Sequence, residues 1–238
     1  MPTGVALHDA RAQLLAAAER VIFREGVSGL TSRAVTEEAG VAKGVLHRYF
    51  TDYNSFLAEL VREHISQVEA YGRELAQLAG SETLASNLST ALTRIFDPVK
   101  LLLIGLVMTR SNLRSQLMGA HQKGIPLLID ATHVLSDYLE AERGLGRMKA
   151  GTDVPALALT LTGTGHLLFA SELGRVPDGA AIREIVESIA AREHPNLWRN
   201  LPDPIKDAVH ARVRQQLPEI VDELATNIGE NIDDLIDV

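Results

Sequence analysis

Side chains that can donate hydrogen bonds to nucleic acid gather in one short stretch, residues 31–52 (TSRAVTEEAGVAKGVLHRYFTD). Lysine, arginine, histidine, tyrosine and threonine can reach phosphate oxygens or base edges. A glycine lets the backbone approach a phosphate closely, and a valine can touch a thymine methyl group. The candidate DNA-binding residues are Thr31, Arg33, Lys43, Gly44, Val45, His47, Arg48 and Tyr49. For each, the alternative is structural: a solvated cation, a plain surface valine, or, at Thr31, a helix cap alone.

The same stretch predicts the two elements that would position these side chains. Apolar residues fall four apart on each side of Gly40, which can supply the positive φ of a tight turn. The two pairs are Val35 with Ala39, and Leu46 with Phe50. Thr31 is a good N-cap for the first helix, and the second helix is expected from about Ala42. Two helices, a glycine turn and a polar outer face are typical of a helix-turn-helix DNA reader.

Residues 13–60 resemble the N-terminal domain of TetR-family transcriptional regulators. The matching positions are Ala17, Ala18, Phe23, Gly26, Thr31, Ala39, Gly40, Val41, Gly44, Leu46, Phe50 and Leu57. Family members often carry Ser or Thr at 42, Tyr at 47, His at 49 and Lys at 53, where this chain has Ala42, His47, Tyr49 and Tyr53. The resemblance implies a dimer that binds successive major grooves of a palindromic operator and leaves it when a small molecule binds the body.

The distribution of charge limits what the head can do. The net charge is −8, and residues 1–60 contain six Lys or Arg against seven Asp or Glu. The overall charge of the head therefore does not favour binding to nucleic acid. What favours it is the position of Arg33, Lys43 and Arg48 on the expected reading surface. We expect modest non-specific affinity and a shallow dependence on salt. A helical interaction protein that no longer reads DNA specifically is the alternative function, motivated by this acidic balance and by Tyr53.

Helical periodicity runs along the whole chain, without strand alternation, and predicts an all-α fold. We expect a three-helix DNA-binding head in residues 1–53, beginning with a helix at 8–24 that Gly26 ends. A helical ligand-binding and dimerisation body should span 54–192, with a connecting helix at 54–78. Further helices are expected at 81–96, 99–109, 112–122, 126–142, 153–173 and 180–192. Residues 193–238 should form a C-terminal amphipathic helical extension.

Several polar residues interrupt the apolar helices of the body, and the resemblance implies that they orient a small apolar effector. They are Thr109, Arg110, Asn112, His121, His133, Thr160, Thr164 and His166. For each one the alternative is a satisfied core group or a surface position. Aromatic residues make up only 4% of the chain, which favours an acyl, lactone or terpenoid-like effector over a flat cation.

No motif supports catalysis, and neither catalytic residues nor a cofactor is expected. The spacing of His121, His133 and His166 matches no metal-site pattern, so no metal is expected. Residues 163–166 (GTGH) follow no strand, and Leu168 stands where a dinucleotide motif needs its third glycine. These small residues more simply permit close helix packing.

Composition indicates a cytoplasmic protein without a membrane span. Cysteine is absent, which excludes disulfides and thiolate metal sites. The N-terminus MPTGVALHDAR lacks the apolar core of a signal peptide. The most apolar run, residues 99–108, contains Lys100 and is too short to cross a bilayer, so a buried helix is expected.

Two regions are predicted to form a homodimer. Leu157, Ala158, Leu161 and Gly165 offer an apolar face with small residues in the helix expected at 153–173, with residues 180–192 alongside. The tail adds an apolar stripe at Ile220, Leu224, Ile228, Ile232 and Leu235. After Pro218 it carries seven acidic residues and no Lys or Arg. We expect this tail to brace the dimer away from DNA, and a frayed acidic terminus is the alternative.

Overall fold

The computed structural model describes residues 7–118, 124–172 and 176–190. The chain divides into two compact units, residues 1–193 and 194–238, and all the described residues belong to the first. Every regular element among them is a helix, which confirms the all-α prediction. His121 and the extension at 193–238 lie outside the described residues.

Three helices form the head: α1 (Leu7–Gly29), α2 (Ser32–Glu38) and α3 (Gly44–Tyr49). Gly26, predicted to end the first helix, instead kinks it with a φ of 72°. Gly40 has a φ of 67° in the turn between α2 and α3, as predicted. Helix α3 has no side-chain N-cap and begins at Gly44, two residues later than expected, since Ala42 has no side-chain acceptor to start it.

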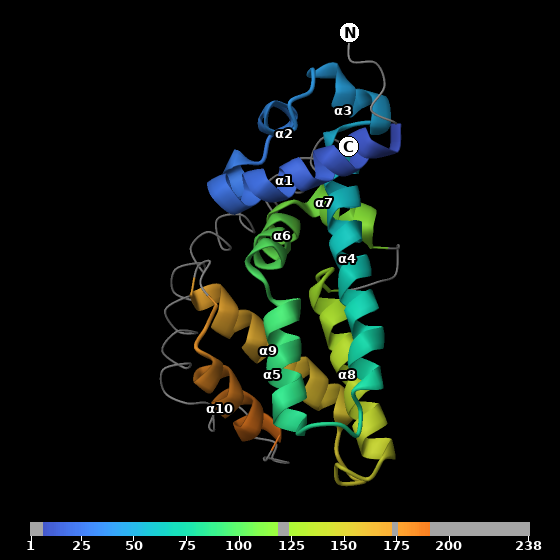
Figure 1. Cartoon of the computed structure of the whole chain (residues 1–238), viewed down its shortest axis with the longest axis vertical. Coiled ribbons are helices and arrows are strands. Elements are labelled where there is room, and N and C mark those ends of the chain that lie inside the picture. Colours follow the sequence, from blue (N-terminus) through green and yellow to red (C-terminus); the bar gives the residue numbers. More distant parts are fainter. Residues whose placement is uncertain (1–6, 119–123, 173–175, 191–238) are drawn as a thin grey trace, which may run out of the picture. The chain divides into compact units, whose positions relative to one another are not determined.

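Helix α4 (Tyr53–Gln77) connects the head to the body, as expected. It begins where the carboxylate of Asp52 accepts a hydrogen bond of 2.7 Å from the amide of Ser55. Its lower half runs beside α8 (Leu128–Gly144) (Figure 1). The two helices approach closely because Gly72 has no side chain: a Cβ there would lie 2.6 Å from a methyl of Val134.

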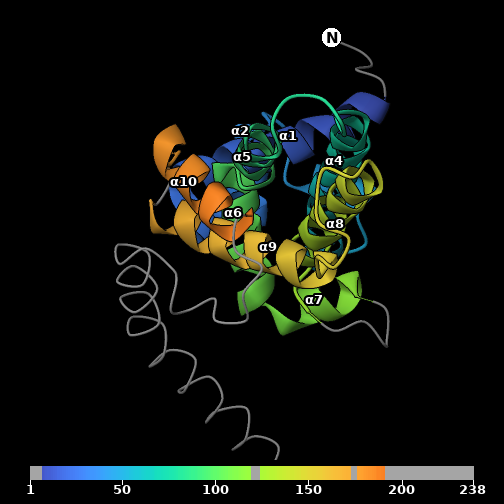
Figure 2. The same cartoon turned by 90° about the horizontal axis from the view of Figure 1, so that it is seen from below.

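The rest of the body is built around α5 (Leu84–Ile95), α9 (Val154–Ser171) and α10 (Gly179–Ala190). Figure 2 shows α10 beside α5 and α9, with which it is in contact. The hydroxyl oxygen of Thr83 caps α5 by accepting a hydrogen bond of 3.1 Å from the amide of Ser86, so the helix begins three residues later than the expected start at 81.

Two shorter helices, α6 (Pro98–Thr109) and α7 (Ser111–Leu117), lie between the body and the head. The carboxylate of Asp97 caps α6 by accepting a hydrogen bond of 2.9 Å from the amide of Lys100, with Pro98 in the first helical position. Helix α6 packs against α1, and α7 packs against α4. The contact of α6 with α1 places the body directly against the head.

Helix α9 is apolar on most of its circumference. By length and composition it could cross a membrane, but it packs against α8, α10 and α6. Ala158, Leu161 and Gly165, which were predicted to face a dimer partner, are buried within the protomer, so that prediction was wrong. Periodicity could not distinguish the inner from the outer face of such a helix. A Cβ at Gly165 would lie 2.9 Å from side-chain atoms of α5 and of Phe96, which confirms close helix packing at this glycine.

A buried polar network joins the turn after α4 to α8. The Glu142 carboxylate, fully buried, accepts hydrogen bonds from the Tyr138 hydroxyl at 2.5 Å and from the Gly80 amide at 3.4 Å. Its second oxygen faces the Arg147 guanidinium at 3.4 Å, as an ion pair without hydrogen-bond geometry. Arg147 also donates to the carbonyl of Ser81 at 3.1 Å. These contacts fix the lower end of α4 to α8.

Candidate nucleic-acid interface

The outer face of α3 carries most of the predicted DNA contacts. Lys43, His47 and Arg48 are exposed, while Val45 and Tyr49 are partly exposed. Leu46, on the opposite face of the helix, is fully buried. The short helix is thus held by its apolar side and presents its polar side to solvent, which is the placement a reading helix requires.

Ion pairs within the head decide which cations remain available. Four of its arginines are paired with carboxylates: Arg11 with Glu59, Arg20 and Arg24 with Glu38, and Arg33 with Glu37. Hydrogen bonds from Arg20 and Arg24 lower the pKa of Glu38 and keep it ionised. Among the described residues of the head, only Lys43 and Arg48 are cations without an ion-pair partner. Free positive charge is therefore concentrated at α3.

The remaining candidates of the head have definite local roles. Thr31 caps α2 by accepting a bond of 3.1 Å from the amide of Ala34, which leaves its hydroxyl hydrogen free for a phosphate. Arg33 is bound to Glu37 at 2.7 Å and must exchange that partner to reach DNA. Gly44 is exposed, and a Cβ built on it would meet nothing within 4 Å.

Tyr53 was noted in the sequence only for lacking the lysine charge common in the family. Its hydroxyl donates a hydrogen bond of 2.6 Å to the carbonyl of Leu30, just before the cap of α2. The side chain therefore points into the head. This role was missed because the partner lies 23 residues away along the chain.

The residues predicted to orient an effector lie in three places. Thr109, Arg110 and Asn112 are at the junction of α6 and α7, and Thr109 bonds to the α6 backbone. His133 is exposed on α8. On α9, Thr160 and His166 are partly buried and Thr164 is buried. The His166 ring lies 6.1 Å from that of Phe96. His121 cannot be placed, as it is outside the described part of the chain.

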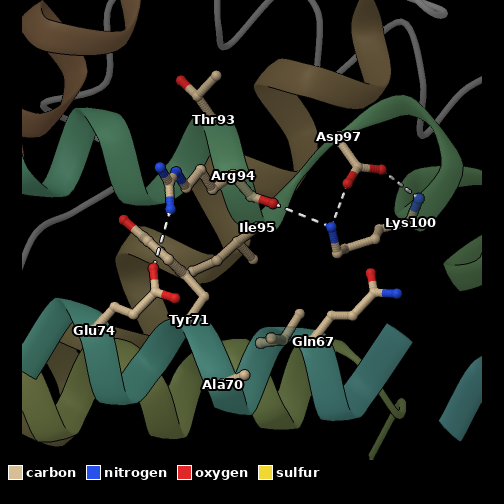
Figure 3. A pocket seen from close by; sticks show the side chains of 10 residues that line it. Gln67, Ala70, Tyr71, Glu74, Thr93, Arg94, Ile95, Asp97 and Lys100 are labelled. Atoms are coloured by element: carbon tan, nitrogen blue, oxygen red, sulfur yellow. Dashed lines mark hydrogen bonds and ion pairs between the residues drawn. The ribbon is translucent and has the colours of Figure 1, made fainter. Parts of the chain in front are cut away.

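A cleft of about 560 Å³ opens between α4, α5 and the start of α6 (Figure 3). None of the predicted effector residues lines it. Its lining residues are Gln67, Val68, Ala70, Tyr71, Glu74, Thr93, Arg94, Ile95, Asp97 and Lys100. The volume lies within the range of small-molecule pockets in proteins.

The cleft combines apolar walls with a buried cation. Lys100 is 7% exposed, and its ammonium donates to the carbonyl of Arg94 at 3.2 Å and to the carboxylate of Asp97. The Arg94 guanidinium pairs with Glu74 at 3.2 Å and lies over the ring of Tyr71. Burial raises the pKa of the Tyr71 hydroxyl, which therefore stays protonated. The sequence signal for this site was Lys100, the one charge within the most apolar run.

Comparison with known proteins agrees with the geometry of the head. The family described as bacterial regulatory proteins, tetR family, matches residues 14–60, which include α2, α3 and the start of α4. The head of the chain belongs to the TetR family. This assignment confirms the prediction of a DNA-binding transcriptional regulator with a helix-turn-helix head. TetR-family proteins are regulators, not enzymes. No curated protein matches this TetR-family chain.

Solved structures share the fold of this TetR-family protein beyond the head. The regulator FadR from Bacillus subtilis, in complex with stearoyl-CoA, has a TM-score of 0.59 at 20% identity, over 77% of this chain and 99% of that chain. The fatty acid degradation regulator FadR from Bacillus halodurans has a TM-score of 0.59 at 15% identity, over 80% and 97%. A regulator from Mesorhizobium loti assigned to the TetR family has a TM-score of 0.56 at 17% identity, over 77% and 94%.

Proposed function

We propose that this TetR-family protein is a ligand-responsive repressor, released from a palindromic operator when a small apolar molecule binds its body. The observation that carries the DNA-binding half of the proposal is the exposed face of α3. There, Lys43 and Arg48 are free of ion pairs within the described part of the head, and Gly44 leaves room for close approach. Such a surface places donors where base edges and phosphates lie in a major groove.

A palindromic site needs two reading heads, so the protein should act as a homodimer. A regulator that binds DNA should act in the cytoplasm. The dimer is assigned to α9 and α10. With the inner face of α9 buried, its outer face offers Pro155, Ala156, Leu159 and Gly163, all exposed. Leu159 is 64% exposed and lies on one face of α9 with these other exposed small or apolar residues, so a partner bound here would bury a continuous apolar surface.

The effector site is assigned to the cleft between α4, α5 and α6. Val68, Ile95 and the Tyr71 ring suit an apolar chain. At its end, Arg94 and Lys100 could hold a polar or anionic group by exchanging their carboxylate partners, Glu74 and Asp97, for it. The similar FadR from Bacillus subtilis binds stearoyl-CoA, which makes acyl-CoA the first class of effector to test. The cleft borders α4, so an effector with higher affinity for one tilt of α4 would shift the position of the head.

Selection of bound fragments from random duplex DNA by the purified protein tests the DNA-binding proposal. A palindromic motif supports it, and transcription from a promoter carrying that motif should fall when the protein is added. Absence of any enriched motif would favour the alternative, a helical interaction protein without specific DNA reading.

Stearoyl-CoA and free CoA, added to the protein–operator complex, test the effector site. Stearoyl-CoA should release the protein from the operator, and free CoA should not. Ala70→Phe, which fills the cleft, should keep operator binding and lose the response. Ala76→Phe, at an exposed position of the same helix outside the cleft, is the matched control and should respond normally. Equal responses of the two variants would place the effector elsewhere.

A further inference from the structure

The start of α4 is joined to the helix-turn-helix by an aromatic cluster, Phe50, Tyr53 and Phe56. The Phe56 ring is fully buried, stacks on Tyr53 at 5.8 Å and meets Phe50 edge-on at 5.0 Å. Phe50 is the C-cap residue that directly follows α3. The cluster therefore connects the end of the reading helix to the first turn of α4.

One directional contact adds to this packing. The hydroxyl of Tyr53 bonds the carbonyl of Leu30 at 2.6 Å, and the next residue, Thr31, is the cap that starts α2. Leu30 itself is only 1% exposed, so its position is fixed by the core of the head. Stacking tolerates sliding, whereas a hydrogen bond between two ordered groups sets one separation. The bond thus determines how α2, and α3 with it, is oriented on α4.

The Tyr53 hydroxyl keeps its proton, and so its ability to donate this hydrogen bond, at neutral pH. Burial raises the pKa of Tyr53 to about 12, so that the hydroxyl remains a donor well above neutral pH. Arg110, at the junction of α6 and α7, lies near enough to act electrostatically on the same hydroxyl. The joint between head and α4 is consequently also the place where the body approaches the head.

We propose that Tyr53 is a positioning residue that sets the orientation of the reading helix on α4, and hence the half-site spacing that the dimer accepts. Two heads bind a palindrome together only when the distance between their reading helices matches the distance between successive major grooves. A head that rotates on α4 samples several distances and discriminates less among operators. This inference rests on the proposed dimer at a palindromic operator.

Tyr53→Phe tests the inference, because it keeps the ring and removes only the hydroxyl. Affinity is measured for the operator selected by the wild type and for versions with one base pair added to or removed from the spacer. Loss of the bond should lower the preference for the selected spacing by about three- to tenfold. Thr162→Val, which removes a buried, hydrogen-bonded hydroxyl from α9 in the body, is the stability control. It should lower the melting temperature and leave the spacing preference unchanged.

A weakening of Tyr53→Phe that is equal for all spacings, or no change at all, would overturn the inference. Failure of the wild type to bind any selected operator would instead overturn the proposed function. If the variant binds operators too weakly for spacing preferences to be compared, a distance measurement without DNA still tests the positioning role. Because the chain has no cysteine, Ala42→Cys carries a single spin label per head. The label-to-label distances in the dimer should spread more widely in Tyr53→Phe, and an unchanged distribution would count against the positioning role.

Discussion

At the scale of residues, the head of this TetR-family protein separates its cations into two groups. Arg11, Arg20, Arg24 and Arg33 are held by carboxylates of the head itself or of α4, whereas Lys43 and Arg48 are free among the described residues. Paired arginines release few counterions on binding DNA. The affinity should therefore depend weakly on salt, in agreement with the near-neutral charge of residues 1–60.

Lys43→Ala should lower operator affinity by about 1–3 kcal/mol and relax specificity at one base pair, because a lysine at this point of α3 can donate to a guanine. Affinities for a panel of single-base operator variants provide the measurement. Arg73→Ala removes an exposed cation from α4 and should change nothing. Uniform weakening across the panel would make Lys43 a phosphate contact.

Gly44→Leu should abolish operator binding without altering the fold. A Cβ at this position meets nothing within 4 Å in the free protein, so only a close approach to DNA would make the side chain clash. Operator binding and thermal melting are measured together. Gly144→Leu, another open and exposed glycine, should bind normally. An operator affinity of Gly44→Leu equal to that of the wild type would show that the backbone stays away from the DNA here.

Local structural features such as caps and turns were predicted well from the sequence, whereas contacts between residues distant along the chain were not. The cap at Thr31 and the turn at Gly40 each depend on atoms within a few residues, so residue type and spacing suffice. The inward role of Tyr53 depends on a partner 23 residues away, and the lining of the cleft joins residues 67–74 with residues 93–100. Only the folded chain brings them together.

At the scale of elements, the contact of α4 with α8 is set by a small residue. Gly72→Ala should lower the free energy of unfolding by about 1–3 kcal/mol, because the added methyl would overlap the side chain of Val134. Urea denaturation measures the loss. Val134→Ala in the same chain should recover much of it by making room. If the double variant were no more stable than Gly72→Ala, the two side chains would not be in conflict.

Glu142→Ala should cost about 3 kcal/mol of unfolding free energy, because Arg147 and Tyr138 would lose their buried partner. Glu140→Ala on the same helix removes an exposed carboxylate paired with Arg143 and should cost below about 1 kcal/mol. Melting curves of the two variants give the comparison. Similar losses would mean that the network contributes little.

Helix α9 shows where element-level prediction reaches its limit. Its extent was predicted to within two residues at each end, but the face assigned to a partner is the face that packs within the protomer. In an amphipathic helix, the polar residues mark the exposed face, and the buried face is therefore the opposite one. A helix with apolar residues on nearly all sides gives no such signal.

At the scale of the whole molecule, the outer face of α9 is where a second copy should bind. Leu159→Asp should raise the dimer dissociation constant by roughly tenfold or more, since a carboxylate would be buried in both halves of a two-fold interface. Sedimentation at micromolar concentration measures it. Leu145→Asp changes a leucine of similar exposure just after α8 and should remain dimeric. A monomeric wild type would contradict the proposed dimer directly.

The network around Glu142 gives α4 the properties of a lever. It holds the helix at its lower end, near Gln77, while the cleft borders it at Tyr71 and the head joins it at Tyr53. At 1.5 Å per residue, Tyr71 lies roughly 9 Å from the held end and Tyr53 roughly 36 Å. Displacement along a rigid rod grows in proportion to the distance from its fulcrum. A shift of about 1 Å at the cleft would therefore become about 4 Å at the head.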